Sequence, residues 1–346
     1  MAEKPAVSQD GAAEANGAST AAAARGFFAR ICAHYKKWWW AHVIVLIIVV
    51  LVVVLPVVYV GYPRIAQGDV NDSTLTVTQM IITDPTPDSF HLNQTQVIGS
   101  HSQYHPWFDE FDANVTLLGS ATPFAVLQIP RVQSKDGAVV RIDQRLQLGN
   151  VSAFGEYSKA VMLNEEVTLN VYGRPKLREG KLPKISVTYN KTVTMKGLNS
   201  LKGFNVTDFQ ILLDKQSDGA NTNGTVYIPN PTVMILEMGN VTLSLSVAGT
   251  PIGQSHLQNL LLRPGDNHIP MRSTVNQSLV INMVNGKNAP YANGTLPVEI
   301  TGNSSVYNGR ELPYFTEALA ANRLTVDLDV RKALEAIGVN FGGGSS

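Results

Sequence analysis

The most apolar stretch of the chain runs from Val43 to Val60 without a charge, and it divides the sequence into two unlike parts. It has eighteen residues, all Val, Ile or Leu except Pro56 and Tyr59. At about −0.3 to −0.6 kcal/mol for each aliphatic residue, insertion into a bilayer is favoured by roughly 5 to 10 kcal/mol. With its neighbours the run reaches the ~20 residues that cross a hydrocarbon core. We therefore predict a transmembrane helix over residues 38–62.

A cleaved signal peptide and a buried helix of a soluble protein are the alternative interpretations of this run. The run begins about forty residues after Met1, and it exceeds the apolar core of a signal peptide, about 7–15 residues. Polar residues do not mark one face of it, as they would on a helix that packs against a soluble core. Both observations favour a retained membrane anchor.

The charges that flank the run are asymmetric. Four basic residues and three tryptophans lead into it, namely Arg25, Arg30, Lys36, Lys37 and Trp38 to Trp40. After it, Arg64 is followed by Asp69 and Asp72. Since cytoplasmic flanks are enriched in Lys and Arg, we predict a cytosolic N-terminus and a C-terminal part that lies in a lumen or outside the cell. The formal net charge of zero gives no sign of a nucleic-acid partner.

The segments at the two ends are predicted to lack a fold. Residues 1–24 consist largely of Ala, with some Gly, Ser and Glu, and the basic cluster follows them, so we expect residues 1–37 to be a disordered cytosolic tail. Residues 336–346 read as a flexible tail. Cys32 is the only cysteine, which excludes an intramolecular disulfide. Its place beside the basic cluster makes it a candidate for palmitoylation, and an unmodified thiol is the alternative.

Acceptor sequences for N-glycosylation, Asn-x-Ser/Thr, are frequent beyond the anchor. Chance predicts about three or four. The sequence has eleven, at Asn71, Asn93, Asn114, Asn150, Asn190, Asn205, Asn223, Asn240, Asn276, Asn293 and Asn303. The excess supports exposure to the glycosylation machinery, whereas accident in an Asn- and Thr-rich β protein is the alternative.

Apolar and polar residues alternate in short runs over most of the remaining chain, which is typical of half-buried strands. The runs lie at 73–83, 114–119, 124–129, 139–149, 167–173, 185–195, 209–214, 241–249, 257–265 and 296–302. Helical patterns are few, chiefly 314–323 and a segment near the end. We therefore predict an all-β ectodomain of two tandem antiparallel sandwiches, residues 69–195 and 196–335.

The ectodomain sequence is also predicted to contain an imperfect repeat. The segment 81–90 matches 226–235, where a strand breaks at Asp84-Pro85 or at Asn230-Pro231. Further on, 167–173 and 180–183 match 296–302 and 309–313. Because proline cannot donate to a ladder and holds the preceding residue extended, each Asx-Pro pair is expected to release its strand from a neighbour.

Residues 226–271 carry a pattern of turn residues that resembles the fungal family of unknown function DUF3712, and 189–199 resembles its linker between copies. The residues that match are Asn230, Pro231, Gly239, Gly253, Pro264, Gly265 and Asn267. The resemblance implies a sandwich similar to the type 2 late-embryogenesis-abundant (LEA-2) or fibronectin III fold. With the anchor, it also implies a fungal vacuolar membrane protein of a group in which one member is associated with ending autophagy.

One cluster has the composition of a metal site. His101 and His105 precede Asp109, Glu110 and Asp112, which are residue types that bind zinc. Pro106 disfavours the helix that would bring both imidazoles to one face, so we interpret the segment as a polar loop, with a zinc or catalytic site as the alternative. No familiar hydrolase, metalloprotease or nucleotide-binding motif is present. We predict no catalytic, cofactor or metal site and therefore no enzyme.

Two functions remain open at the level of sequence. The first is a luminal interaction or sensing module that is tethered to the membrane. The second, implied by the resemblance to LEA-type folds, is binding of a lipid or another apolar ligand inside the sandwiches, which needs an apolar cavity. The fungal vacuole is the expected location, with the plasma membrane and the endoplasmic reticulum as alternatives.

Overall fold

The computed structural model describes residues 36–285 and 288–339. The chain divides into two compact units, Met1–Arg64 and Ile65–Ser346. Most of the predicted cytosolic tail, with Cys32, Arg25 and Arg30, lies outside the described residues, and so do residues 340–346 at the other end.

One helix, Lys36–Asp72, is long and apolar enough to cross a membrane, and none of its most apolar window is buried inside the protein. That exposure excludes the buried core helix of a soluble protein for this segment. Two wider turns of π type, η1 (Val50–Val54) and η2 (Val57–Gly61), flank Pro56, because proline cannot donate to the helical ladder and the turns beside it adjust. The last part, α2 (Tyr62–Asp72), continues into the second unit.

The N-terminal half of the second unit contains seven long strands in two sheets that share one core. The order around the sheets is β1-β2-β7 and β5-β4-β8-β11, with one bridge, Ala125↔Leu148, between β5 and the end of β7. The bounds are β1 (Thr74–Thr86), β2 (Ser89–Gly99), β4 (Phe111–Leu117), β5 (Ala125–Ile129), β7 (Ala138–Gln147), β8 (Glu166–Gly173) and β11 (Tyr189–Lys196), with helices α3 (Val151–Leu163) and η3 (Asn199–Leu201).

The C-terminal half contains seven long strands in the order β12-β13-β16-β15-β14-β17-β19. The strands are β12 (Asn205–Ile211), β13 (Thr222–Asn230), β14 (Met234–Val247), β15 (Thr250–Leu262), β16 (Gly265–Val275), β17 (Thr295–Tyr307), the short β18 (Arg310–Glu311) and β19 (Arg323–Asp329). The helices are α4 (Gln277–Val284), α5 (Pro313–Ala321) and α6 (Arg331–Ala336).

The two halves have the same topology. If the long strands of each half are counted in chain order, both follow the spatial order 1-2-5-4-3-6-7, and a helix joins strands 5 and 6 in each. Segments 167–173 and 296–302 are both sixth strands, as the repeat predicts. The other predicted match, between 81–90 and 226–235, does not relate equivalent strands. Asp84-Pro85 lies at the end of the first strand of its half, and Asn230-Pro231 lies at the end of the second strand of its half. The turns resemble each other in sequence, but they join different strands.

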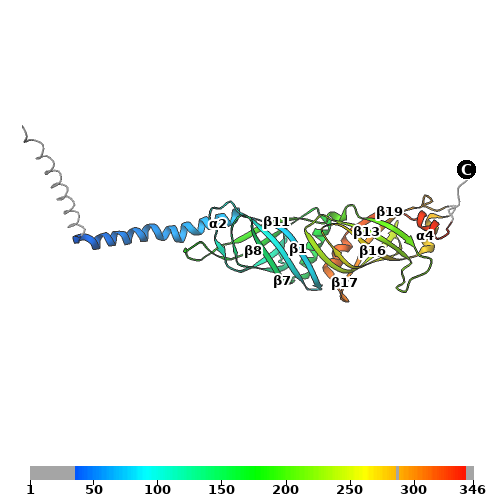
Figure 1. Cartoon of the computed structure of the whole chain (residues 1–346), viewed down its shortest axis with the longest axis horizontal. Helices are drawn as coiled ribbons and strands as arrows, with labels where there is room; N and C mark the ends of the chain where they lie inside the picture. Colours follow the sequence, from blue (N-terminus) through cyan, green and yellow to red (C-terminus); the bar gives the residue numbers. More distant parts are fainter. Residues whose placement is uncertain (1–35, 286–287, 340–346) are drawn as a thin grey trace, which may run out of the picture. The chain divides into compact units, whose positions relative to one another are not determined.

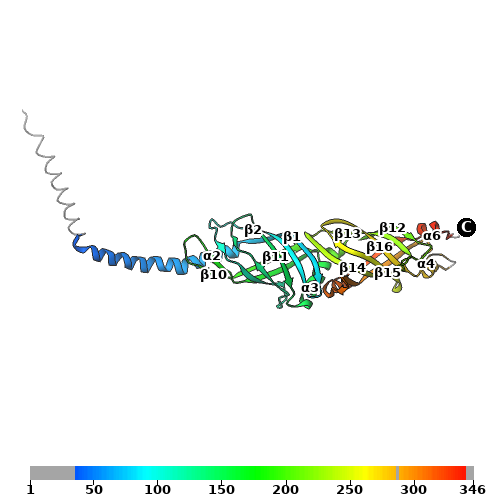
Figure 2. The same cartoon turned by 60° about the horizontal axis from the view of Figure 1, so that its bottom comes forward.

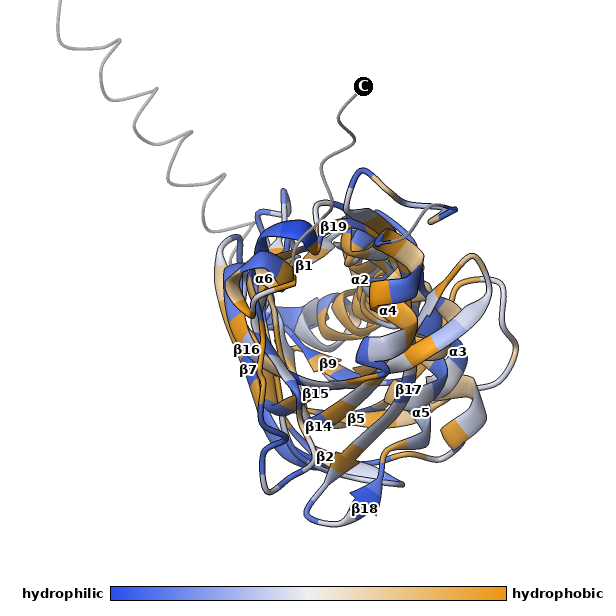
Figure 3. Cartoon of the chain, turned by 90° about the vertical axis from the view of Figure 1, so that its right-hand side faces the viewer, coloured by the Kyte–Doolittle hydropathy of each residue, from blue (hydrophilic) through white to orange (hydrophobic). Residues whose placement is uncertain are grey.

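The alternation of side chains explains most of these strands. In β8, and in β13 from Val226 to Asn230, every second residue is buried, as expected for sheets with one face on the core, and Figure 3 shows the resulting bands of hydrophobic and hydrophilic colour. Strand β2 is not among the predicted runs. Its buried positions include Gln94 and Gln96, each 4% exposed, so its apolar alternation is interrupted by polar residues that point inward.

The halves are joined by a continuous sheet. Strand β1 of the first half pairs in parallel with β14 of the second, with Met80 opposite Met234 and Ile82 opposite Leu236. We call this pairing the seam, and Figure 1 shows the two halves end to end. Further along, β14 leaves β1 and pairs with β17 from Asn240 onward. Gly239 lies at this exchange of partners, with a φ of +68°.

One helix from each half also contributes to the junction between the halves. Helices α3 and α5 pack side by side, as Figure 2 shows. The rings of Phe154 and Tyr314 meet edge to face at 5.0 Å between centroids, and the hydroxyl of fully buried Tyr314 donates to the carbonyl of Thr86 at 2.9 Å. Burial raises the pKa of Tyr314, so this phenol remains protonated as a donor.

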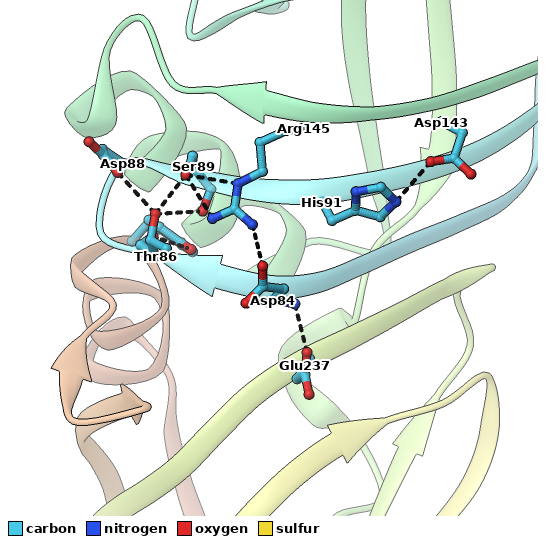
Figure 4. Close-up of polar contacts among 9 residues, drawn as sticks. Asp84, Thr86, Asp88, Ser89, His91, Asp143, Arg145 and Glu237 are labelled. Carbon is cyan, nitrogen blue, oxygen red and sulfur yellow. Dashed lines mark hydrogen bonds and ion pairs between the residues drawn. The ribbon is translucent and has the colours of Figure 1, made fainter.

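A polar network also crosses the junction (Figure 4). The guanidinium of Arg145 on β7 donates to the carboxylate of Asp84 and, at 3.0 and 3.2 Å, to the hydroxyl of Ser89. The backbone amide of Asp84 donates to Glu237 of β14 at 2.7 Å. Asp84 has a φ of +47°, an unfavourable conformation for most residues. The network therefore stabilises the unfavourable backbone conformation of Asp84 beside the seam.

The fold class is confirmed at the level of a mostly β ectodomain with sandwich sheets after one apolar helix. One hydrophobic core runs through both halves. The boundary at residues 195 and 196 and the LEA-2 or fibronectin III type of the sandwiches stay predictions. Helix α5 was expected at 314–323 and lies at Pro313–Ala321, whereas α3 and α4 were not expected.

Candidate functional site

A small third sheet projects from the first half and carries the candidate site. It has the order β10-β9-β3-β6, with β10 (Ile185–Ser186), β9 (Lys176–Arg178), β3 (Trp107–Phe108) and β6 (Val132–Gln133). Leu177 and Phe108 are 1% and 5% exposed. Because successive residues of a strand point to opposite faces, these two apolar side chains fix one face of the sheet inward, and the other face is left polar.

The register of the small sheet gathers charged residues on its polar face. Trp107 lies between Arg178 of β9 and Gln133 of β6 as a direct cross-strand neighbour of both. Such neighbours have Cβ atoms about 5 Å apart. Residues two positions away share the face, which adds Lys176, Asp109 and Arg131. Residues more than fifty positions apart in the sequence thus form one surface.

A cleft of about 630 Å³ lies over this face. It is large enough for a small organic ligand, since ligand pockets are typically about 300–1,000 Å³. The nine residues that line it are His105, Trp107, Asp109, Arg131, Gln133, Arg178, Glu179, Gly180 and Lys184. We call it the polar cleft.

Ion pairing inside the polar cleft is incomplete. Lys184 and Asp109 form an ion pair at 2.7 Å. The hydrogen bond from Lys184 holds the pKa of Asp109 below its usual value, and the charges of Arg131 and Lys176 act in the same direction. Arg131 lies over the ring of Trp107 at 4.7 Å. The cleft therefore has a local positive field, because the three cations Arg131, Arg178 and Lys184 outnumber its two carboxylates.

The structure brings only part of the predicted histidine cluster together. His105 and Asp109 line the polar cleft, whereas His101, Glu110 and Asp112 do not. The Nδ1 atom of His105 is buried and has no hydrogen-bond partner among the described residues. Within residues 36–285 and 288–339, no group of three His, Cys, Asp or Glu residues is placed to hold a metal ion.

The sequence does not predict the cationic side chains of the polar cleft. Arg131, Arg178 and Lys184 lie on three separate segments, and no local motif connects them. Arg131 and Lys184 each precede a strand of two residues, and Arg178 ends a strand of three. Strands this short give no clear alternation signal. Only the pairing of β9 with β3 and of β3 with β6 reveals the surface.

The interiors of the two halves offer little space for an apolar ligand. Each half contains a cavity of about 50 Å³ that is lined almost entirely by apolar side chains. An acyl chain needs several times this volume, because typical ligand pockets begin at about 300 Å³. As they stand in this structure, these cores are packed too closely for the lipid-binding alternative.

The predicted glycosylation asparagines lie at the surface. Three are half-buried, namely Asn93, Asn150 and Asn223, and the other eight are exposed. Several use Oδ1 as an acceptor, as at the helix N-caps Asn150 and Asn276, which leaves the Nδ2 atom that carries a glycan available. In Asn93, by contrast, Nδ2 donates to Asp143 at 3.2 Å.

The Asx residues of the family pattern stabilise turns. Asn230 is 2% exposed, donates to the carbonyl of Met234 and accepts from the amide of Thr232, both at 2.9 Å. Asn267 accepts from the amide of Arg263 at 2.9 Å and donates to its carbonyl at 2.8 Å. Pro231 follows Asn230 at the end of β13, while Pro264 and Gly265 form the turn that Asn267 closes.

Two of the three pattern glycines, Gly239 and Gly253, lie where backbones approach closely, whereas nothing lies within 4 Å of a Cβ built on Gly265. A Cβ on Gly239 would lie 2.4 Å from the carbonyl oxygen of Val306, and one on Gly253 would lie 2.2 Å from that of Thr274. Side-chain carbon atoms do not approach backbone oxygens so closely. These contacts give the pattern a structural explanation, and none of its residues lines the polar cleft.

Comparison with known proteins supports the family resemblance. The family model described as "Protein of unknown function (DUF3712)" matches residues 122–245. This match begins in the first half and ends within β14, so it includes Asn230, Pro231 and Gly239 but not Gly253, Pro264, Gly265 or Asn267. No curated protein matches the chain in sequence.

Likenesses to solved structures are weak. An adhesin from Mobiluncus mulieris with intramolecular cross-links is 9% identical, covers 67% of this chain and 79% of its own, and has a TM-score of 0.20. The periplasmic chaperone SfaE is 10% identical and covers 74% and 100%, with a TM-score of 0.17. A partial N-terminal region of an enterococcal surface protein is 8% identical and covers 74% and 93%, with a TM-score of 0.16. Scores this low carry no argument.

Proposed function

We propose that the chain is a non-enzymatic, single-pass membrane glycoprotein whose ectodomain is an interaction or sensing module. The N-terminus lies in the cytosol, and the sandwiches lie in a lumen or outside the cell. The observation that carries the proposal is the surface position of the acceptor asparagines in a domain that follows an unburied apolar helix. The basic residues before that helix support the same orientation.

The resemblance to fungal vacuolar proteins supports the vacuole membrane as the location, and the autophagy-associated group is the nearest functional context it offers. The sandwich type proposed is LEA-2-like. Of the two functions, interaction is better supported than binding of an apolar ligand. A wide polar cleft lies on the surface, whereas the internal cavities are narrow.

N-glycosidase treatment of the full-length protein should increase its electrophoretic mobility, because the exposed acceptor asparagines carry glycans. Two matched variants sharpen the test. Asn114→Gln should remove part of the shift, since Asn114 is exposed in the middle of β4. Asn93→Gln should leave the shift unchanged, since its Nδ2 is engaged by Asp143. A protein with no shift at all would contradict the proposed topology.

The interaction role predicts partners that depend on the ectodomain. Full-length protein and a version that ends after Arg64 should be cross-linked in intact membranes and purified through an N-terminal tag. We expect proteins recovered only with the full chain, because the polar cleft belongs to the second unit. Identical partner lists from the two versions would count against an interaction module, whatever the glycosylation result.

A further inference from the structure

The polar cleft has a surplus of positive charge. Its face carries four cationic side chains, Arg131, Lys176, Arg178 and Lys184. The carboxylates of Asp109 and Glu179 are the acids that line the same cleft. Among the side chains that line the cleft, the three cations Arg131, Arg178 and Lys184 outnumber the two acids by one. Lys176 lies on the same face of the small sheet and adds a further positive charge beside the cleft.

Several nitrogen atoms in the cleft have no hydrogen-bond partner among residues 36–285 and 288–339. Arg178 uses Nε to donate to the carbonyl of Gly180 at 3.1 Å, and its two terminal nitrogens have no partner among the described residues. Arg131 contacts the ring of Trp107 and makes no hydrogen bond there. The Nδ1 atom of His105 is also unpaired among the described residues, and it is buried, whereas Arg131 and Arg178 are exposed. Buried polar atoms such as this Nδ1 are rarely left unpaired unless a ligand or water completes them.

These donors have the chemistry of a phosphate site. A guanidinium group presents a planar fork that binds two oxygens of one oxyanion. A phosphate monoester carries about −1.5 to −2 charges at pH 7, so a positive cleft attracts it more strongly than it attracts a carboxylate, which carries a single charge. The volume of about 630 Å³ exceeds that of a lone ion, and the half-exposed ring of Trp107 at the rim offers an apolar surface for the rest of the ligand.

We propose that the polar cleft binds the phosphate group of a small organic phosphate, with Arg131 and Arg178 as its principal ligands. The proposal rests on the binding module proposed above and names its ligand class. A soluble phosphorylated metabolite and a phospholipid headgroup share this chemistry. Lys184 steers the anion by its charge, while its pairing with Asp109 keeps it from being the main contact.

The test is calorimetric titration of the purified full-length protein in phosphatidylcholine nanodiscs. Glycerol 3-phosphate should bind saturably, and glycerate, which has a carboxylate in place of the phosphate, should bind at least tenfold more weakly. Nanodiscs that contain phosphatidate separate the two sources. If the natural ligand is a headgroup, the heat of glycerol 3-phosphate binding should disappear there, and if it is soluble, the heat should remain.

Variants decide whether binding occurs in the cleft. Arg178→Gln and Arg131→Gln should each weaken glycerol 3-phosphate binding at least tenfold, and Arg178→Lys should have an intermediate effect because it keeps the charge and loses the fork. Arg141→Gln is the control, since Arg141 is exposed on β7, away from the cleft. Arg131 donates no hydrogen bond to another of the described residues, so its variant remains informative if Arg178→Gln impairs folding.

The proposal is overturned if neither nanodisc composition supports saturable phosphate binding, if glycerate binds as tightly as glycerol 3-phosphate, or if Arg141→Gln is as harmful as Arg178→Gln. These results are independent of orientation, because the nanodisc exposes both faces of the membrane. Failure of phosphate binding with a normal N-glycosidase shift would therefore reject the ligand class and leave the proposed topology in place.

Discussion

Replacement of Gly239 by alanine should lower the free energy of unfolding by about 3 kcal/mol. A left-handed conformation costs an L-residue roughly 1–2 kcal/mol, and Gly239 has a φ of +68°. The new Cβ would also overlap the carbonyl oxygen of Val306, 2.4 Å away, and overpacking of this kind adds about 1–3 kcal/mol. Because β14 exchanges β1 for β17 here, the substitution acts on the junction of the halves. Guanidinium unfolding of the detergent-solubilised protein measures it.

Gly249→Ala is the matched control for this experiment. Gly249 also has a positive φ, +75°, but nothing lies within 4 Å of a Cβ built on it. It should therefore lose only the conformational part, about 1–2 kcal/mol. The difference between the two variants isolates the close approach of β14 to β17. If both substitutions lower the free energy of unfolding equally, the close approach of β14 to β17 does not contribute to the effect of Gly239→Ala.

Replacement of Lys191 by methionine should destabilise the start of the ectodomain by about 3 kcal/mol. Lys191 on β11 is 6% exposed, and its ammonium donates to the carbonyls of Val70, Asn71 and Ser73 at the C-terminal end of α2. Each buried carbonyl that loses its donor costs about 1–3 kcal/mol, with the smaller value where water can replace it. A cation is also favoured at this end of a helix.

The loss of stability in Lys191→Met should also be detectable locally, in the residues that Lys191 contacts. Hydrogen exchange of residues 65–73 should accelerate in Lys191→Met, because these residues lose the side chain that holds them to β11. Lys196→Met is the control, since Lys196 lies on the same strand and is exposed. Unchanged exchange at 65–73 would mean that other contacts, such as Gln67 with the backbone of Thr188, are sufficient.

Two effects act in opposite directions on the pKa of Lys191. Removal from water lowers the pKa of its ammonium, and the nearby carboxylate of Asp72 opposes this shift. The three carbonyls explain why a cationic side chain is nevertheless buried. A methionine of similar length fills the space but satisfies none of them, so the expected loss measures the hydrogen bonds rather than the packing.

Strand prediction succeeded where burial follows alternation and failed where polar residues are buried. The runs at 167–173 and 296–302 became the sixth strands of the two halves. Strand β2 was missed because Gln94 and Gln96 occupy inward positions. Helix α3 was not predicted, although Ser152, Glu156 and Lys159 form a short polar stripe opposite buried Phe154 and Tyr157.

The candidate site was predicted only in part. His105 and Asp109 belong to the histidine segment that composition singled out, and both line the polar cleft. Arg178 and Arg131 reach the same cleft through strand pairing between distant segments. A sequence shows which residues carry charge, but the register of three short strands determines which charges share a face.

The sequence by itself determined the apolar helix and the β character of the ectodomain, because length, composition and alternation are local properties that each segment carries alone. Only the tertiary structure decided how the halves are joined and where the cleft forms. The parallel pairing of Met80 with Met234 and the meeting of Trp107 with Arg178 depend on contacts between distant residues. Such contacts are selected by the packing of the whole core, and no single segment contains the information that specifies them.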